Sequence, residues 1–493
     1  MKGFGEEYKS KKTGKKKSKA SQEQIINKAF YFHSKGNISE AAKYYKSFID
    51  QGFKNHLVFS NYGVILSDLG KLKEAELLYR KAIELNPKHA EVHYNLGHLM
   101  STRGKLKEAE LLYRKAIELN PNYVKAYFNL GHALSNLGKL KEAELSYSKV
   151  IKLNPNYTEA YYLLSSLKYS SENKNWKNQL FNESILNLKT KEDQINIYFA
   201  RANILHKEKN YEDSSKFLQL ANQLKLTLHP SNCDALINKS KALLIESNKQ
   251  AINQKEYIKS HESIFIVGMP RSGSTLLESI LSMNPDIDDL GESEILEKSF
   301  LDYKKSNQKL NLAERYWEKI RDLKKQSNKT TNKNLYNFLY AGIIAKKIPN
   351  SKIIHCYRNP LDNILSIYRA HFTQGNEYSS SLMDCAIIYL KQEEIMSNYK
   401  SRFRSKIYDL NYDSLVCNPN QEIKSLISWL GWEWSDAYLS PHLNPREIFT
   451  ASKVQVRSPI NSKSIGGWKN YKDIMKPCIE ILTQSEKYRN LPF

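Results

Sequence analysis

The sequence has 493 residues and a formal net charge of +23, with 26% charged residues. A chain of this length exceeds what one hydrophobic core holds, so we expect at least two domains. None of its apolar runs reaches the roughly 20 residues of a membrane-spanning helix, and its N-terminus carries lysines but no apolar segment, so we expect neither a membrane span nor a secretory signal.

Residues 1–20 contain eight lysines and almost nothing apolar, which predicts a disordered basic tail. A solvated tail is favoured over one that binds nucleic acid or an anionic surface. The remaining positive charge would suit a domain that binds a polyanionic nucleotide. The five cysteines are scattered, with neither disulfide nor zinc spacing, and the histidines form no metal-binding motif. We therefore expect reduced thiols, a cytoplasmic location and no metal.

A period of 34 residues runs through the next part of the chain. It relates glycines, alanines, tyrosines and prolines alike, as in Gly63, Gly97 and Gly131. The segments GKLKEAELLYRKAIELNP and YFNLGHALSNLG resemble the two helices of a tetratricopeptide repeat (TPR). We expect an α-solenoid over residues 21–225, degenerate after residue 155, and a helical connector over residues 226–259. The resemblance implies a groove that binds a protein or peptide, and this reading is favoured over an array that only rigidifies or dimerises the chain.

The sequence SIFIVGMPRSGST, residues 263–275, predicts a buried strand, a glycine-containing loop and the start of a helix. Backbone N–H groups of such a loop and the positive end of the helix dipole meet at one point, where a phosphate group fits. The spacing of Gly268 and Gly273 is that of a Walker A loop, but Ser274 stands where that loop has its lysine. The missing lysine argues against an ATPase or GTPase, and Arg271 supplies a cation instead.

GMPRSGST followed by a helix resembles the 5′-phosphosulfate loop of sulfotransferases, which use 3′-phosphoadenosine-5′-phosphosulfate (PAPS). Within that family it is most similar to the tyrosylprotein sulfotransferases and their bacterial relatives. The resemblance implies that the co-substrate PAPS is bound by the residues of this loop: Arg271, Ser272, Gly273, Ser274 and Thr275.

Two further positions complete the catalytic group that this resemblance implies. Gly291-Glu292 lies where the family carries its catalytic base, so Glu292 is favoured, with Glu294 as the reserve. The tyrosylprotein enzymes read Gly-Glu-Glu and use the second Glu, a position that Ser293 occupies here. Lys333, in TTNKNLYN, matches the lysine that contacts the bridging oxygen of the donor, where a cation stabilises the charge that develops on the leaving phosphate. Arg271 is the third catalytic candidate. An acidic residue at Glu292 could also be a plain helix cap.

The segment SKIIHCYRNPLDNILSIY predicts a second buried strand and then a helix capped by Asn359. Arg358 and Ser366, eight residues apart, match the pair that binds the nucleotide 3′-phosphate in the family. The alternative is that Arg358 has no ligand and makes only a structural salt bridge at the end of the strand. In KIYDLNYDS the resemblance assigns Tyr412 to the nucleotide. In VQVRSPINSKSIGGWKNY it implies contacts from Arg457, Ser458, Lys463, Ser464 and Trp468, although Gly467 replaces the family's lysine before the tryptophan.

The sequence therefore predicts an α-solenoid of TPR helices followed by an α/β, P-loop-like parallel-sheet domain over residues 260–493. By resemblance it is a PAPS-dependent sulfotransferase acting without a metal on an acceptor hydroxyl: a protein tyrosine or other peptide group, a saccharide or a small molecule. A nucleic-acid partner is not expected. Two alternatives stay open, a P-loop kinase or NTPase and a TPR scaffold with an inactive enzyme domain. The sequence fixes neither the acceptor nor the oligomeric state.

Overall fold

The computed structural model describes residues 19–167, 175–249, 261–306, 311–323, 327–372, 375–450 and 452–490. The predicted basic tail falls outside these ranges except for residues 19 and 20, as do residues 250–259 of the predicted connector and residue 260 of the predicted enzyme domain. The chain divides into two compact units, Met1–Ala133 and Leu134–Phe493. The domain boundaries expected at residues 225 and 259 stay predictions.

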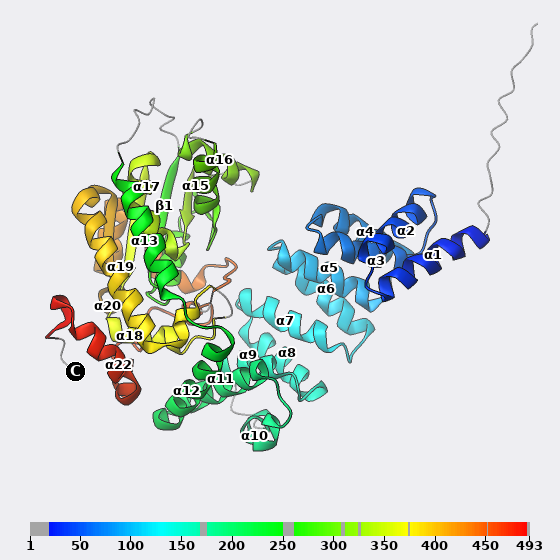
Figure 1. Cartoon of the computed structure of the whole chain (residues 1–493), viewed down its shortest axis with the longest axis horizontal. Coiled ribbons are helices and arrows are strands. Elements are labelled where there is room, and N and C mark those ends of the chain that lie inside the picture. Colours follow the sequence, from blue (N-terminus) through cyan, green and yellow to red (C-terminus); the bar gives the residue numbers. More distant parts are fainter. Residues whose placement is uncertain are drawn as a thin grey trace, which may run out of the picture. The chain divides into compact units, whose positions relative to one another are not determined.

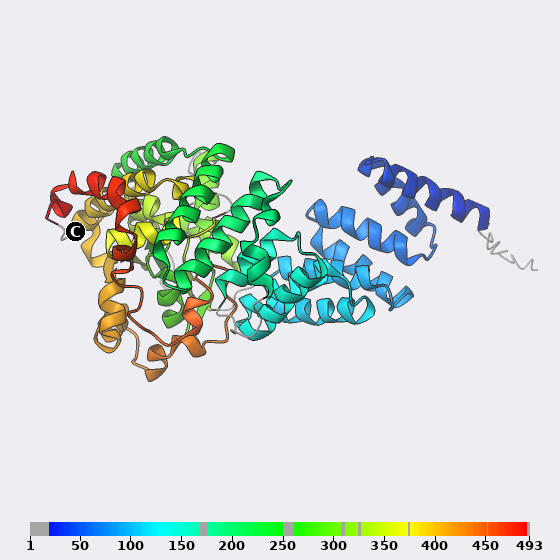
Figure 2. The same cartoon turned by 90° about the horizontal axis from the view of Figure 1, so that it is seen from below.

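The first unit is a series of antiparallel helix pairs, which Figures 1 and 2 show in blue. In Gly97 an added Cβ would lie 2.9 Å from Cε1 of the buried Tyr113, and Gly63 stands in the same relation to Tyr79. The glycines therefore let paired helices cross closely, and the tyrosines fill the space between them. The helices are α1 (Lys19–Ser34), α2 (Ile38–Asp50), α3 (His56–Asp68), α4 (Leu72–Leu85), α5 (Ala90–Thr102), α6 (Leu106–Leu119) and the first part of α7 (Val124–Asn136).

The second unit begins with further helices before its sheet. Helices α11 and α12 form a pair, and their residues Phe199 and Leu218 belong to one hydrophobic core with Met269, Ile364 and Trp468 from the C-terminal part. The repeat-like helices are thus packed into the same unit as the predicted enzyme domain. They are α8 (Leu140–Leu153), α9 (Thr158–Ser166), α10 (Asn175–Phe181), α11 (Lys191–Lys207), α12 (Tyr211–Leu228) and α13 (Cys233–Asn248).

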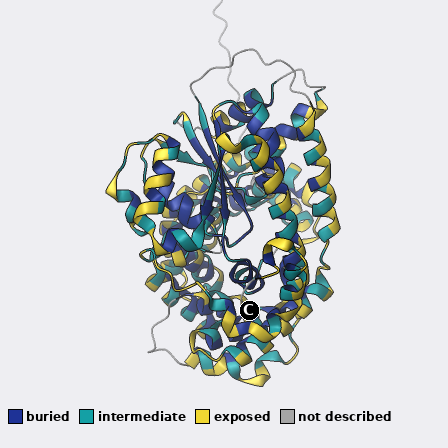
Figure 3. Ribbon diagram, turned by 90° about the vertical axis from the view of Figure 1, so that its left-hand side faces the viewer, coloured by how far each residue is buried: buried dark blue, intermediate teal, exposed yellow. Residues whose placement is uncertain are grey.

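The sheet of the second unit has five strands in the order β2-β3-β1-β4-β5, and every pairing is parallel. The central strands β1 and β4 are almost wholly buried, as a strand covered on both faces must be, and Figure 3 shows them in dark blue. Gly268 pairs with Cys356, so β1 and β4 end side by side. The strands are β1 (Glu262–Gly268), β2 (Ile287–Asp289), β3 (Lys329–Asn332), β4 (Ser351–Tyr357) and β5 (Ile407–Asn411).

Two separate cores lie against this sheet. One joins Phe265 and Ile353 to helices α15, α16, α17 and α19, and the other joins Ile264 and Ile354 to α14 and α21. The helices are α14 (Ser274–Leu281), α15 (Ile295–Lys305), α16 (Leu312–Asp322), α17 (Ala341–Lys347), α18 (Pro360–Tyr368), α19 (Leu382–Phe403), α20 (Tyr412–Cys417), α21 (Pro419–Leu430) and α22 (Lys472–Thr483), with a 3₁₀ turn η2 (Leu335–Tyr340) before α17 and another, η8 (Gly467–Tyr471), before α22.

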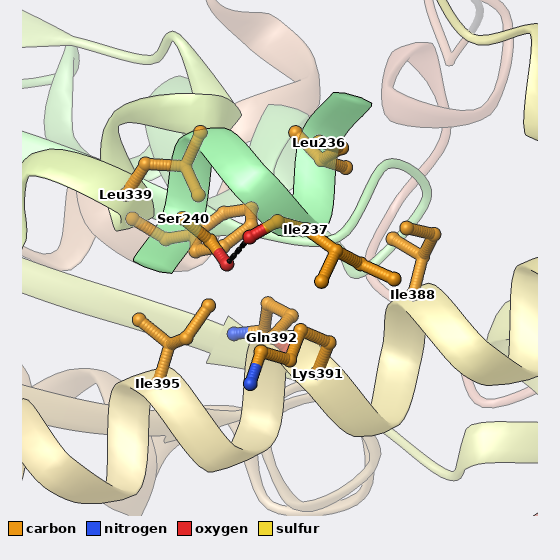
Figure 4. Close-up of a pocket in the computed structure, with 9 residues that line it drawn as sticks. Leu236, Ile237, Ser240, Leu339, Ile388, Lys391, Gln392 and Ile395 are labelled. Carbon is orange, nitrogen blue, oxygen red and sulfur yellow. Dashed lines mark hydrogen bonds between the residues drawn. The ribbon is translucent and has the colours of Figure 1, made fainter. Parts of the chain in front are cut away.

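A narrow hollow lies between α13 and α19, and Figure 4 shows its lining. Its wall is mostly aliphatic, with Lys391 and Gln392 on the α19 side. None of the predicted site residues lines it. Within the described ranges, no helix combines the length and apolarity needed to cross a bilayer. No cluster of three or more His, Cys, Asp or Glu side chains among these residues is placed to hold a metal ion.

Candidate functional site

Two glycines shape the loop that follows β1. Gly268 has φ +145°, and an added Cβ would lie 2.2 Å from the carbonyl oxygen of Cys356. Gly273 has φ +99°, and its Cβ would lie 2.2 Å from Cδ2 of Tyr412. Both positions therefore need glycine for conformation and for space. The second glycine brings the ring of Tyr412 directly against the loop.

The N-terminus of α14 has no side-chain cap, because Gly273 occupies the N-cap position. Among the described residues no side chain caps its first N–H groups, which carry the positive end of the helix dipole. Ser272, Ser274 and Thr275 are buried around them, and the Ser272 hydroxyl is buried without a hydrogen-bond partner among the described residues. Unsatisfied donors at this point favour an anion.

Arg271 leaves the same loop and reaches two other segments. Its Nε donates to Ser366 Oγ of α18 at 3.0 Å, and its guanidinium also donates to Ser452 Oγ and, at 3.1 Å, to Gln455 Oε1. Burial and the nearby guanidinium groups of Arg358 and Arg369 lower the pKa of Arg271 to about 10. Three like charges gathered at one place again favour an anionic ligand.

Arg358 follows β4, as predicted, and only 6% of it is exposed. Its guanidinium lies over the ring of Tyr412 at 4.7 Å, and its Nη2 donates to the carbonyl of Ser464 at 2.9 Å. The Tyr412 hydroxyl lies 3.1 Å from Ser464 Oγ. The Nε of Arg358 is buried with no hydrogen-bond partner among the described residues, and its nearest carboxylate oxygen, on Asp413, lies 3.8 Å away. Arg358 thus retains a donor for a ligand.

The closing segment is fastened to the start of α18. Asp362 accepts hydrogen bonds from the backbone N–H of Gly466 at 2.7 Å and of Trp468 at 3.0 Å. Trp468 itself is buried in the core shared with α18 and α22, and Lys463 is exposed. Ser464 is therefore the member of this predicted group that the structure brings to Arg358 and Tyr412.

Arg457 makes hydrogen bonds to the backbone of three other residues. Its guanidinium donates to the carbonyl oxygens of Asn444, Arg446 and Asn136, the last residue of α7. Lys453 Nζ also donates to Asn136 Oδ1, at 2.8 Å. Residues 452–457, which contact Arg271 through Ser452 and Gln455, are therefore also bonded to the last residue of α7, which lies in the same unit.

Lys333 and Glu292 form the second part of the site. Lys333 follows β3, its side chain is almost completely buried, and its Nζ donates to Glu292 Oε1 at 2.6 Å. The Glu292 side chain is 55% exposed, so it also faces solvent. Glu294 instead occupies the N-cap position of α15 and pairs with Lys298 at 3.2 Å, away from Lys333. The geometry joins the predicted base to the predicted lysine.

Sequence reasoning missed three residues of this part of the site. Glu278 of α14 is 2% exposed, and its Oε2 lies 3.8 Å from Lys333 Nζ and accepts from Arg446 Nη2 at 2.9 Å. Arg446 also pairs with Asp289 at the end of β2. Burial raises the pKa of Glu278 to about 8, against the pull of Lys333 and Arg446. For Glu278 the available signal was a single charge among the leucines and isoleucine of TLLESIL.

The donors present fit a nucleotide with a 5′ anionic chain and a 3′-phosphate. The uncapped α14 N-terminus and buried Ser272 suit the first group, and Arg358 with Ser366 suits the second. Arg271 links the two sets.

Comparison with known proteins finds family matches in both parts of the chain. Residues 263–436 match the model described as the Sulfotransferase family, and residues 63–101, 90–123 and 112–144 match models of the tetratricopeptide repeat. The chain therefore combines tetratricopeptide repeats with a sulfotransferase family domain. This confirms the predicted fold class, an α-solenoid and a parallel-sheet α/β domain.

Several individual proteins are similar to parts of this chain. An uncharacterized protein of Aquifex aeolicus is 29% identical over 252 residues, which cover 46% of this chain and 33% of that protein. The match thus spans a third of its length. Protein-tyrosine sulfotransferase 2 of Gallus gallus is 24% identical over 50% of this chain and 76% of its own, and protein-tyrosine sulfotransferase 1 of Danio rerio is 24% identical over 43% and 67%. Among solved structures, the MamA protein is 18% identical over 43% of this chain and 96% of its own, with a TM-score of 0.29.

Proposed function

We propose that this protein transfers a sulfuryl group from PAPS to an acceptor hydroxyl. The observation that carries the proposal is the hydrogen bond from Arg271 Nε to Ser366 Oγ, because it places the phosphosulfate-type loop beside the predicted 3′-phosphate pair. The sulfotransferase family match over residues 263–436 supports the same activity.

In this proposal the loop from Arg271 to Thr275 holds the 5′ end of the donor, and Arg358 with Ser366 holds its 3′-phosphate. Tyr412 and Ser464 lie beside Arg358, where they would close over the nucleotide. PAPS, when bound, supplies an activated sulfuryl group on a phosphate leaving group.

Glu292 is placed to remove the proton of the acceptor hydroxyl, since its carboxylate is half exposed and ionically paired. The same ion pair holds Lys333 next to the base. When Glu292 takes up a proton, its attraction for Lys333 falls, and the ammonium is freed for the negative charge on the leaving phosphate. Proton removal and charge stabilisation would thereby be linked through one 2.6 Å contact.

The acceptor class is proposed from the relatives and the repeats together. The protein-tyrosine sulfotransferases act, by name, on tyrosine in proteins, and the repeats provide helix pairs of the kind that bind protein segments. We propose a protein or peptide tyrosine as the first acceptor to test. The five cysteines are free thiols, in keeping with the cytoplasmic location that the sequence predicts and that stays a prediction.

The test is calorimetric titration of the full chain, without metal, with 3′,5′-adenosine bisphosphate and separately with ATP. We expect micromolar binding of the bisphosphate, at least tenfold weaker binding of ATP, and a loss of about 100-fold in affinity in Arg358→Ala, because a charged hydrogen bond to phosphate is removed. Arg404→Ala, which removes an exposed arginine from the turn before β5, is the matched control. Binding of Mg-ATP without binding of the bisphosphate would contradict the proposal and favour a P-loop kinase or NTPase.

A separate assay tests transfer itself. The full chain is incubated with PAPS carrying a labelled sulfuryl group and an acidic tyrosine-containing peptide, and the label in the peptide is counted. Label that appears with wild type and is lost in Glu292→Gln supports the assigned base. Bisphosphate binding without transfer to any hydroxyl acceptor would favour a scaffold with an inactive enzyme domain.

A further inference from the structure

Five charged side chains, which include the predicted base and lysine, form a closed ring. Lys333 bridges Glu292 and Glu278, and Arg446 bridges Glu278 and Asp289. The ring closes through the backbone, because Gly291 N donates to Asp289 Oδ1 at 2.6 Å and Lys333 N donates to the carbonyl of Gly291 at 2.8 Å. The residue preceding Glu292 is thus held by the same group of charges.

Glu278 differs from the other members of this ring. It is on α14, the helix whose N-terminus receives the predicted phosphate, and it is the most deeply buried carboxyl of the three. Its Oε2 accepts from Arg446 Nη2, and the neighbouring Asp289 carboxylate, which can hydrogen bond to a protonated Glu278, raises the pKa of Glu278 further. A carboxylate in such a place carries a large desolvation cost, so its charge is maintained only by its cations.

We propose that Glu278 is a positioning residue for the reaction, which acts through Lys333 by competing with Glu292 and the donor for the lysine's ammonium group. This rests on the proposed function. The ring holds two cations and three carboxyls, so it is neutral overall only when one carboxyl carries a proton. Buried Glu278 is the carboxyl with the weakest hold on a negative charge.

The two states of Glu278 have opposite consequences for the donor. Neutral Glu278 leaves the Lys333 ammonium to Glu292 and to an incoming phosphate. Ionised Glu278, 3.8 Å from Lys333 Nζ, attracts that ammonium toward α14 and away from Glu292. It also adds a negative charge near the site. A bound phosphate near Lys333 should therefore favour the protonated form of Glu278. The groups that face Glu278 are Lys333, Arg446 and Asp289, with Glu292 beyond Lys333.

The experiment measures proton uptake when 3′,5′-adenosine bisphosphate binds. The full chain is titrated calorimetrically at pH 7 and pH 8 in pairs of buffers with different ionisation enthalpies. At pH 8 the phosphates of the ligand are already ionised, and Glu278, with a pKa of about 8, is half protonated. Wild type should take up about half a proton per ligand at pH 8 and much less at pH 7.

Glu278→Gln keeps the shape of the side chain without an ionisable group. It should bind the bisphosphate without this uptake, and it should keep its affinity between pH 7 and pH 9 while wild type loses about tenfold. Lys453 also has a pKa near 8, so the difference between the two proteins is the quantity that counts. Glu246→Gln, which alters a carboxylate shared by Lys249 and Lys304, is the matched control and should behave as wild type.

Equal proton uptake in wild type and Glu278→Gln would overturn the proposal. So would a Glu278→Gln variant that loses bisphosphate affinity at pH 7 relative to wild type, because that result would require an ionised carboxylate at that pH. Failure of wild type to bind the bisphosphate at pH 7 would instead contradict the proposed function. The two failures are therefore distinguishable in one set of titrations.

Discussion

Arg271 and Ser366 are 95 residues apart, and the Nε of the first donates to the Oγ of the second at 3.0 Å. The sequence assigned Arg271 to the phosphosulfate end of the donor and Ser366 to its 3′-phosphate. Their contact brings the two predicted subsites together. If the proposed donor binds as predicted, one guanidinium would respond to both of its ends, and Arg358 and Arg369 are close enough to depress the pKa of that guanidinium.

This contact predicts non-additive effects on bisphosphate binding. Arg271→Ala should weaken binding by about 100-fold and Ser366→Ala by about tenfold, because a charged donor is worth more than a hydroxyl. The double variant should lose less than the product of the two, by a coupling energy of about 1 kcal/mol, since each change already breaks the shared hydrogen bond. Calorimetric dissociation constants of the four proteins close the cycle. Strictly additive losses would show that the two side chains act independently.

Gly273→Ala should abolish the site while leaving the fold largely intact. The new Cβ would lie 2.2 Å from Tyr412 Cδ2, so Tyr412 must leave the loop and with it the guanidinium of Arg358. Gly431→Ala is the matched control, because Gly431 also has a positive φ, +71°, but open space around it. Each change should lower the free energy of unfolding by about 1 kcal/mol. Only Gly273→Ala should lose bisphosphate affinity, by tenfold or more in calorimetry, and an equal loss in both variants would refute the steric argument.

The parts of the site that sequence reasoning found are those with local chemistry. The loop at Gly268–Thr275 and the Asn359-Pro360 start of α18 each carry their signal within a few residues, and β1 and β4 are apolar runs. Strands β2 and β3 were missed because they are short, three and four residues, and rich in Asp, Asn and Thr. They are strands only because each pairs with a neighbour.

The ring around Glu278 could not be predicted for a related reason. Its five charges come from α14, β2, the segments that follow β2 and β3, and the segment before residue 450, and only tertiary structure brings them together. The sequence predicted Glu292 and Lys333, but not the contacts of Glu278, Arg446 and Asp289 with them. Conversely, Arg457 and Trp468 are residue types that often contact nucleotides. In the structure, however, Arg457 donates to three backbone carbonyl oxygens and Trp468 is buried in the hydrophobic core. Residue type alone does not distinguish a ligand contact from a structural one. The nucleotide contacts of these two residues stay predictions.

The repeat unit offers a test of close helix packing. Gly97→Ala adds a Cβ 2.9 Å from Cε1 of Tyr113 and 3.2 Å from Cβ of Leu112. Alanine improves helix propensity by about 1 kcal/mol, but overpacking against a tyrosine that is 1% exposed should cost about 1–3 kcal/mol. We expect faster amide hydrogen exchange over α5 and α6, read by mass spectrometry. Leu111→Ala, at a side chain 69% exposed, is the control and should leave exchange unchanged. Slower exchange in Gly97→Ala would contradict this expectation and would show that the Tyr113 side chain can move to make room for the added methyl group.

His206 links a repeat-like helix to the closing segment, and this link should fail in acid. Its Nδ1 lies 2.8 Å from the hydroxyl of Tyr471, which also contacts Ser214 Oγ at 3.0 Å. Burial, with the nearby charges of Arg369 and Lys207, lowers the pKa of His206 from 6.5 to about 3. The folded state therefore keeps the imidazole neutral, while the unfolded chain takes up a proton below pH 6.5.

Stability from this group is present above pH 6.5 and is lost as the pH falls from 6.5 toward 3, by about 1 kcal/mol per pH unit. His371, whose pKa burial lowers to about 4, acts in the same direction. His206→Asn, which can hydrogen bond but does not titrate, should therefore have a midpoint of thermal unfolding that falls less between pH 7 and pH 5 than that of wild type. The midpoints, followed by circular dichroism at both pH values, give the comparison. Parallel falls in the two proteins would mean that His206 is already protonated in the native state, and that solvent reaches it.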